Sequence, residues 1–261
     1  MSSDPARPVI YPDLQGRTAF VTGGSGDIGA ETCRWLVANG VNVAAGGRDS
    51  EALDRVVRGI AAAGGEAIAV AADCTDAAAL DEARMAIRRR FGPVDILMAF
   101  AGGGTGRPAP VHETGEADWR SGVDHNLTAT FLTVKAFLPD MRGRGAGAIV
   151  TMASTAGRQD SPASSAYAAA KAGVIMLTRH LAAEVGPAGI RVNCVSPSAI
   201  LTGRTAAMMP PETRAAVAAM HPLRRLGTPA DVAGAALFLA SASASWITGA
   251  TLDVAGGRLM H

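Results

Sequence analysis

From residue 18 onward, the chain alternates short apolar runs rich in β-branched residues with longer stretches whose apolar residues recur every three to four positions. The short runs are TAFVT (18–22), VNVAA (41–45), AIAVA (67–71), ILMA (96–99), AIVTM (148–152), RVNCV (191–195) and TLDV (251–254). Residues 50–63 and 76–91 show the helical spacing. Runs without strict polar alternation indicate strands that are buried on both faces. The pattern therefore predicts right-handed βαβ units and an α/β fold, doubly wound around a seven-stranded, mainly parallel sheet.

The chain shows no interdomain linker, long repeat or low-complexity tract. Its 261 residues exceed the domain average of about 150, but α/β folds of this size are often single domains. We expect a flexible N-terminal tail over residues 1–15 and one domain over residues 16–261.

Charge and cysteine usage narrow the class of protein. The 24 basic and 23 acidic residues give a formal charge of +1, which offers no electrostatic reason to expect nucleic acid or an anionic membrane as partner. No uncharged apolar run is long enough to span a bilayer, and the start lacks an apolar signal core. Cys33, Cys74 and Cys194 lie far apart, as is typical of reduced thiols rather than of a metal site or disulfide framework. We expect a soluble, cytoplasmic protein without a metal.

A glycine-rich turn follows the first strand. Gly24, Gly26 and Gly29 satisfy G-x-G-x-x-G between a strand and a helix, where backbone N–H groups can approach a pyrophosphate. Asp27 is unusual there, because a carboxylate repels phosphate unless it turns away. The alternative role for Asp27 is stabilisation of the helix N-terminus.

The end of the second strand bears on the choice of cofactor. An acidic residue there would bind ribose hydroxyls, whereas Arg48 follows two glycines and can pair with a 2′-phosphate. We therefore expect NADP(H); Asp49 keeps NAD(H) possible, and a solvated Arg48 is the alternative. Asp73, after the third strand, would accept a hydrogen bond from adenine or else cap the helix that starts near Asp76.

The candidate catalytic residues lie between positions 126 and 171. Tyr167 and Lys171 are four residues apart, so on a helix they share one face. Ser154 follows the fifth strand, where sites of open α/β sheets form. The only other tyrosine is Tyr11, and the only other lysine is Lys135. An ordinary surface pair is the alternative interpretation of Tyr167 and Lys171.

These motifs together resemble the short-chain dehydrogenase/reductase family over residues 16–257. TGGSGDIG (22–29) resembles the family's nucleotide turn, and VNCVSPSAILT (192–202) resembles the segment that closes over nicotinamide. Asp73 resembles the acid that contacts adenine, and Asn126 in DHNLTATF resembles the active-site Asn. Ser154, Tyr167 and Lys171 match the catalytic trio in identity and spacing.

The resemblance implies a Rossmann-like fold and a set of site residues. Tyr167 would be the general acid or base, with a pKa lowered by Lys171 and the oxidised nicotinamide, and Ser154 would hold the substrate oxygen. Asn126 would position a water that leads to Lys171. The implied cofactor contacts are Gly23, Ser25, Gly26, Asp27, Ile28, Gly29, Arg48, Asp73, Cys74, Ala101, Gly102, Tyr167, Lys171, Pro197, Ile200 and Thr202.

Three positions depart from the family pattern. Asp27 replaces a glycine of the turn, AFAG (99–102) replaces Asn-Asn-Ala-Gly, and Ser198 replaces a glycine beside the nicotinamide segment. AFAG lacks the two amides that tie the central strand to its neighbours in the family, and Phe100 would instead pack near the cofactor.

The expected activity is NAD(P)(H)-dependent interconversion of a small-molecule carbonyl and a secondary alcohol by hydride transfer. Alternatives are 3-oxoacyl-acyl-carrier-protein reductase, sugar or polyol dehydrogenase and, from another class, a non-catalytic dinucleotide sensor. Alanine-rich helix 165–183 suggests a homotetramer, with a dimer as the alternative. Trp119 and Trp246 are interpreted as packing anchors.

Overall fold

The computed structural model describes residues 7–104 and 108–260. Its strands form one seven-stranded sheet in the order β3-β2-β1-β4-β5-β6-β7, and every neighbouring pair is parallel. The strands are β1 (Thr18–Thr22), β2 (Asn42–Gly47), β3 (Ala67–Ala71), β4 (Ile96–Ala99), β5 (Gly147–Met152), β6 (Ile190–Pro197) and β7 (Thr251–Val254). The predicted fold class is confirmed, with each strand within two residues of its expected position.

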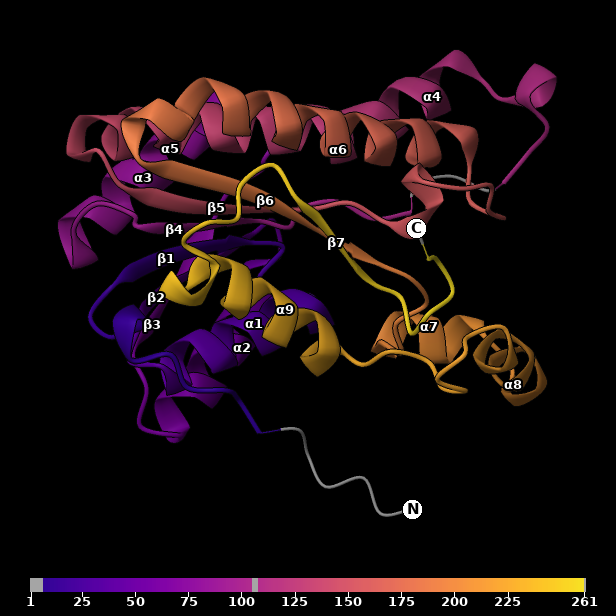
Figure 1. Ribbon diagram of the computed structural model, residues 1–261, viewed down its shortest axis with the longest axis horizontal. Helices are drawn as coiled ribbons and strands as arrows, with labels where there is room; N and C mark the ends of the chain where they lie inside the picture. Colours follow the sequence, from indigo (N-terminus) through magenta and orange to yellow (C-terminus); the bar gives the residue numbers. More distant parts are fainter. Residues whose placement is uncertain (1–6, 105–107, 261) are drawn as a thin grey trace.

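Helices cover both faces of the sheet (Figure 1). One layer comprises α1 (Asp27–Ala38), α2 (Ser50–Ala62) and α9 (Pro229–Ala240). The opposite layer comprises α3 (Ala77–Phe91), α5 (Ala129–Arg144) and α6 (Ser165–Val185), with α4 (Glu116–Val123) packed on α6. Two short helices, α7 (Gly203–Met208) and α8 (Pro211–Ala219), project together beyond the sheet at the lower right of Figure 1.

The two layers enclose separate apolar cores. One joins α1, α2 and α9 to the sheet, and the other joins α3, α5 and α6 to it. Phe20 of β1 and Phe137 of α5 stack in the second core with ring centroids 4.9 Å apart. Because the strands are covered on both sides, β1 is buried along its whole length, as expected from a sequence, TAFVT, that lacks charged residues and strict polar alternation.

Side-chain caps set the starts of several helices. The carboxylate of Asp49 accepts from the Ala52 N–H at the start of α2, and that of Asp76 accepts from the Ala78 N–H at the start of α3. Asp76 is therefore the cap of α3, and the alternative that assigned this task to Asp73 is wrong. An Asp N-cap is worth about 0.5–2 kcal/mol to a helix relative to Ala.

The segment expected as a loose tail is partly attached to the domain. The Tyr11 N–H donates to Asn39 Oδ1 over 2.6 Å, the Asn39 amide donates to the Val9 carbonyl, and Leu14 is buried. Residues 9–14 are thus attached to the end of α1 by two hydrogen bonds and one buried side chain. The composition of the segment did not indicate this attachment. Residues 1–6 of the expected tail lie outside the described residues.

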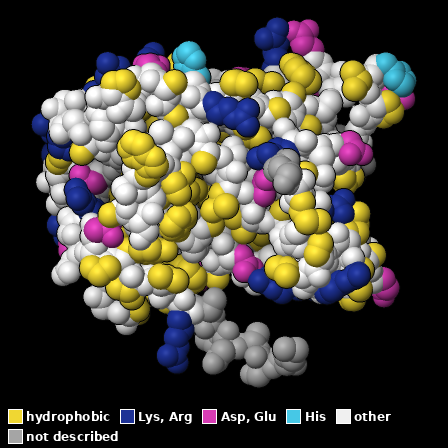
Figure 2. Space-filling model, viewed as in Figure 1, with side chains coloured by type: hydrophobic (Ala, Val, Ile, Leu, Met, Phe, Trp, Pro, Cys, Tyr) yellow, Lys and Arg dark blue, Asp and Glu magenta, His cyan; other side chains and the backbone are white. Residues whose placement is uncertain are grey.

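The strand order reverses direction between β1 and β4, and ligand sites of such sheets lie at the carboxyl ends of the strands near that point. The face shown in Figure 2 mixes cationic and acidic side chains without a large patch of either sign. Among the described residues, no helix is both long and apolar enough to cross a bilayer.

Candidate active site

The glycine turn after β1 is compact in a way that only glycine permits. Gly23 has φ of +67°, a left-handed conformation that residues with a Cβ rarely adopt. A Cβ on Gly29 would lie 2.1 Å from the Gly23 carbonyl oxygen, so the first turn of α1 packs directly on the preceding loop. This close packing leaves a shallow cradle of backbone beside the strand ends, which fits the phosphate groups of a dinucleotide.

A cavity of about 240 Å³ lies at the carboxyl ends of β1, β2, β3 and β4. Seven of the predicted cofactor residues line it, namely Gly23, Ser25, Arg48, Asp73, Cys74, Ala101 and Gly102. Three polar side chains that were not predicted, those of Thr75, His125 and Arg204, also line it. The remaining predicted contacts, Gly26, Asp27, Ile28, Gly29, Tyr167, Lys171, Pro197, Ile200 and Thr202, are not part of its lining.

Arg48 and His125 meet at the adenosine end expected for this cavity. Arg48 is exposed, and its Nη1 lies 3.4 Å from His125 Nε2. The other ring nitrogen, Nδ1, lies 2.8 Å from the Ser121 carbonyl and is its donor, so Nε2 is the acceptor for Arg48. Asp49 does not compete for this corner, because its carboxylate caps α2.

Asp73 is held in a tight turn at the same end. Its Oδ1 accepts from both the N–H and the hydroxyl of Thr75, at 2.9 and 2.7 Å. These hydrogen bonds to the charged form lower the pKa of the Asp73 carboxyl, with a smaller contribution from Arg48. Asp73 therefore presents an ionised acceptor to the cavity.

Ser154, Tyr167 and Lys171 converge beside β5 and α6. The Ser154 side chain is close enough to the Tyr167 phenol to lower its pKa, and Lys171 Nζ lies 5.6 Å from the centroid of the Tyr167 ring. Ser154 comes from the loop after β5, while Tyr167 and Lys171 are one helical turn apart on α6. The three polar groups that were predicted to meet therefore do so.

Burial shifts the pKa values of Tyr167 and Lys171 in opposite directions. Desolvation lowers the pKa of Lys171 to about 8, since the side chain is only 3% exposed. Its Nζ donates to the Met152 carbonyl at 2.9 Å. Burial raises the pKa of Tyr167, and the hydrogen bond from Ser154 and the charge of Arg204 lower it by less. The depressed phenol pKa expected from the resemblance is therefore not a property of the protein by itself.

Asn126 lies in a π-helical turn, Asp124–Thr128, between α4 and α5. Its Oδ1 accepts from the Gly103 N–H at 3.0 Å, and its amide donates to the carbonyls of Gly103 and Gly122. A Cβ on Gly102 would lie 2.6 Å from Asn126 Oδ1 and 3.3 Å from Lys171 Nζ. The space between Gly102, Asn126 and Lys171 is therefore too small for a side chain at position 102.

The first turn of α7 is bound both to the start of α1 and to the loop after β4. The Gly203 N–H donates to Asp27 Oδ2 at 2.9 Å, and Arg204 Nη2 donates to the Gly104 carbonyl at 3.1 Å. Thr202 caps α7 by accepting from the Thr205 N–H. Asp27 is therefore turned toward α7, and Gly26 rather than Asp27 is the N-cap of α1.

The three departures from the family pattern have local compensations. The Thr22 hydroxyl accepts from the backbone N–H groups of Phe100 and Ala101, both at 2.9 Å, and so anchors the end of β4 without the two amides. Phe100 is buried in the core on the α1 side and is not part of the cavity lining, although its neighbour Ala101 is. The Ser198 hydroxyl lies 3.0 Å from Nε2 of His221, which is buried.

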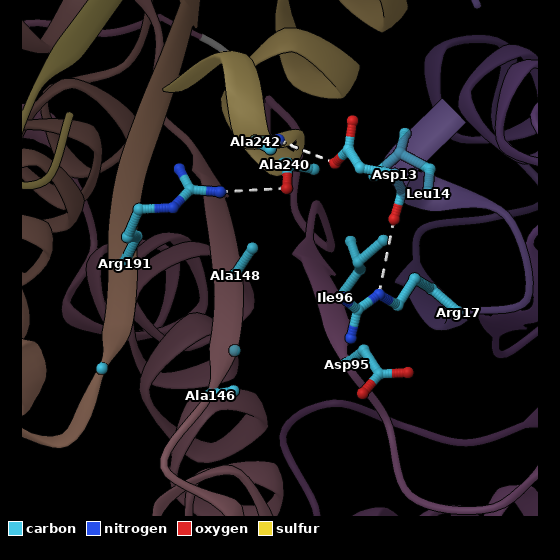
Figure 3. Close-up of a pocket in the computed structure, with 12 residues that line it drawn as sticks. Asp13, Leu14, Arg17, Asp95, Ile96, Ala146, Ala148, Arg191, Ala240 and Ala242 are labelled. Carbon is cyan, nitrogen blue, oxygen red and sulfur yellow. Dashed lines mark hydrogen bonds between the residues drawn. The ribbon is translucent and has the colours of Figure 1, made fainter. Parts of the chain in front are cut away.

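A second cavity, of about 230 Å³, lies at the amino ends of the strands, around Arg191 (Figure 3). Arg191 donates to the carbonyls of Leu239, Ala240, Ser241 and Ala244 after α9. Asp13 accepts from the Ala242 N–H. Arg191 and Asp13 therefore already have hydrogen-bond partners within the protein, and we assign this region to the attachment of the N-terminal segment and β6 to the end of α9.

Four site residues, Thr22, Thr75, His125 and Arg204, were not predicted from the sequence. His125 directly precedes Asn126, so its place beside the site follows once the Asn is identified. Thr22 ends β1, and a hydroxyl at that strand end was a signal for anchoring a neighbouring loop. Arg204 gave no comparable signal, because its position depends on how α7 folds back over the sheet edge. The described residues contain no cluster of three side chains suited to hold a metal ion.

Comparisons with known proteins agree with this geometry. A sequence profile described as Enoyl-(Acyl carrier protein) reductase matches residues 24–258. The chain is 42% identical over 245 residues to a cis-4-hydroxycyclohexanecarboxylate dehydrogenase of Sinomonas cyclohexanicum, covering 92% of this chain and 96% of that protein. It is 40% identical over 247 residues to a galactitol 2-dehydrogenase (L-tagatose-forming) of Cereibacter sphaeroides, covering 94% and 95%.

The fold is also similar to that of solved structures over almost its entire length. The 3-oxoacyl-[acyl-carrier protein] reductase with bound NAD from Brucella melitensis superposes with a TM-score of 0.89 at 35% identity, covering 100% of this chain and 99% of that one. These similarities extend over almost the entire sequence and include the segments that carry the site. The chain belongs to the short-chain dehydrogenase/reductase family and is an oxidoreductase of the type that acts on alcohols and carbonyl compounds.

Proposed function

We propose that the protein is an NADP(H)-preferring dehydrogenase that interconverts a ketone and a secondary alcohol, with Tyr167 as the general acid and base. The observation that carries the proposal is the convergence of three polar side chains: Ser154 interacts with the Tyr167 phenol and lowers its pKa, and Lys171 Nζ lies 5.6 Å from the centroid of the same ring. These groups can deliver a proton and a hydrogen bond to one substrate oxygen.

Each side chain has a separate task in this scheme. In reduction, the Tyr167 O–H gives its proton to the oxygen of the forming alcohol, and in oxidation the phenolate takes that proton back. The Ser154 hydroxyl holds the oxygen in line with the phenol. Lys171 keeps a positive charge below its pKa of about 8, and this charge favours the phenolate. Asn126, fixed by Gly103 and Gly122, orders the route by which a proton reaches Lys171.

The nicotinamide dinucleotide would lie along the carboxyl ends of the strands. When bound, it supplies or accepts the hydride and, in its oxidised form, adds positive charge near the phenol. Three features would hold it: the glycine turn with Gly23 and Gly29, the acceptor Asp73 and the segment Pro197–Thr202. Arg48 favours the 2′-phosphate of NADP(H), since Asp49 is engaged in capping α2.

Replacing the phenol tests the proposal. Tyr167→Phe should lower kcat/KM by about 10²–10⁴-fold, the usual contribution of a general acid, while dinucleotide binding persists. Tyr11→Phe is the matched control because Tyr11 is the only other tyrosine. Near-normal turnover by Tyr167→Phe would refute the assignment. A wild-type protein that binds dinucleotide without turning over any substrate would favour the sensor alternative.

The substrate panel should follow the relatives. We propose hydroxycyclohexanecarboxylates and galactitol first, because proteins named for these substrates are 42% and 40% identical to this chain. A 3-oxoacyl thioester tests the alternative that the solved reductase suggests. Absorbance of the reduced nicotinamide, followed with both cofactors, reports on every member of the panel.

We also propose a homotetramer in a reducing, cytoplasmic compartment. Exposed apolar side chains of α4, α5 and α6 (Trp119, Phe131 and Met176) suit one interface, and Trp246 and Leu252 beside the edge strand β7 suit a second. Trp119 is 42% and Trp246 98% exposed, so the interpretation of these residues as packing anchors does not hold within the chain. The three free cysteines are buried thiols, which is consistent with the proposed compartment.

A further inference from the structure

We propose that Arg204, carried by α7, binds the diphosphate of the nicotinamide dinucleotide and fastens α7 over the cofactor. This inference deepens the proposed function and rests on its dinucleotide site. Arg204 lies outside the glycine turn, to which phosphate binding is ordinarily attributed. Its side chain nevertheless lines the same cavity as Gly23 and Ser25 of that turn.

The first argument is position along the cavity. Arg48 and Asp73 line the cavity where the adenosine would lie, and Tyr167, outside the lining, marks the place expected for the nicotinamide. Arg204 shares the cavity wall with Arg48, and its charge acts on the pKa of Tyr167. A dinucleotide carries its diphosphate midway between adenosine and nicotinamide riboside. A cation placed between the two ends therefore faces the diphosphate.

The second argument is the way the side chain is held. Arg204 Nη2 reaches across to the Gly104 carbonyl at 3.1 Å, and Nη1 lies 3.7 Å from the position a Cβ would take on Gly103. Outside the cavity lining, the Gly203 N–H donates to Asp27 Oδ2 at 2.9 Å. The backbone next to Arg204 is thus tethered to the start of α1, and its guanidinium lies against Gly103 and Gly104.

The third argument is charge. Within the described part of the chain, no carboxylate lies within ion-pair distance of Arg204, and its visible hydrogen bond goes to a neutral carbonyl. Asp27 adds a negative charge beside the path of the diphosphate. A guanidinium can form two charge-assisted hydrogen bonds to phosphate, stronger than its bond to Gly104, and also offset that carboxylate.

Direct binding measurements test the assignment independently of turnover. Arg204→Gln should raise the Kd of NADPH and of NADH by a similar factor of about tenfold, since a tenfold change corresponds to about 1.4 kcal/mol, within the range of a charged hydrogen bond. Calorimetric titration should show the same loss for ADP, which has the diphosphate, and no loss for adenosine 2′-monophosphate, which lacks it. Arg204→Lys should recover part of the affinity because the charge remains.

Arg214→Gln is the matched control. Arg214 donates to the carbonyls of Met209 and Ala206, so its loss loosens the same region without removing charge from the cavity. An equal rise in Kd for Arg214→Gln would overturn the assignment, as would unchanged dinucleotide binding by Arg204→Gln. A higher KM for carboxylate-bearing substrates alone, with dinucleotide Kd unchanged, would make Arg204 a substrate contact and overturn it too. If the wild type binds neither dinucleotide, the proposed function fails with it.

Discussion

Lys171 is a cation that the fold buries at a cost. Its folded pKa of about 8 lies below the ordinary 10.5, so the ammonium destabilises the folded protein at every pH below about 8. The penalty disappears as the pH rises from about 8 to 10.5, and its full size is roughly 3 kcal/mol. The catalytic ammonium is therefore retained against the stability of the protein, as is common at active sites.

Replacing this ammonium should stabilise the protein while it inactivates it. Lys171→Met should raise the free energy of unfolding at pH 7 by about 1–2 kcal/mol, after the cost of leaving the Met152 carbonyl without its donor. The gain over wild type should shrink between pH 8 and 10.5. Urea unfolding at pH 7 and pH 9.5 measures both effects.

Lys135→Met is the control for that experiment, because Lys135 is exposed and is the only other lysine. Its difference from wild type should be small and independent of pH. A Lys171→Met protein that is less stable than wild type at pH 7 would contradict the interpretation.

Arg48 should decide between the two dinucleotides. Arg48→Asp should raise the Kd of NADPH by about 100-fold, since it replaces an attractive charge at the 2′-phosphate with a repulsive one, and should change NADH binding little. Fluorescence titration of both reduced cofactors measures this. Asp54→Asn on α2, an exposed charge change outside the cavity, serves as control. Equal weakening of both cofactors would remove Arg48 from the specificity corner.

How far single residues could be predicted depended on the kind of signal. Ser154, Tyr167 and Lys171 were found because helical spacing and a strand end put them together, and the structure joins them. The pKa of Tyr167 was not predictable, because it depends on burial and on the approach of Arg204 from a distant segment. The contact of His125 with Arg48 was not predictable for the same reason, since the two residues lie 77 positions apart in different βα units.

At the scale of elements, α7 depends on one long-range hydrogen bond to the nucleotide turn. Asp27→Ala should release the Gly203 N–H and speed amide exchange over Gly203–Met208 about fivefold, which corresponds to about 1 kcal/mol. Hydrogen–deuterium exchange measured by mass spectrometry reports this. Asp49→Ala, which removes the cap of α2, should change exchange in α2 and leave α7 unaffected. Unchanged exchange in α7 after Asp27→Ala would show that its other contacts, such as the Thr202 cap and the hydrogen bond from Arg204 to Gly104, are sufficient to hold it.

The regular elements were predictable from the sequence because strands and helices differ in the period of their apolar residues. The strand ends in turn predicted where the site would form. The helices α7 and α8 were not predicted, since neither has buried residues that a periodic apolar pattern would show. The attachment of residues 9–14 escaped prediction for a similar reason, because one buried Leu14 and an Asn39 side chain produce no period.

At the scale of the whole molecule, two apolar surfaces remain exposed and should form two interfaces. Phe131 on α5 is 46% exposed, and Trp246 beside β7 is 98% exposed. Phe131→Asp and Trp246→Asp should each convert the tetramer to a dimer, because a buried, unpaired carboxylate is costly in an apolar interface. The double variant should be monomeric in sedimentation equilibrium. Met85→Asp, on α3 and 46% exposed, should leave assembly unchanged. A wild type that sediments as a monomer, or single variants that remain tetrameric, would show that these surfaces do not pair copies of the chain.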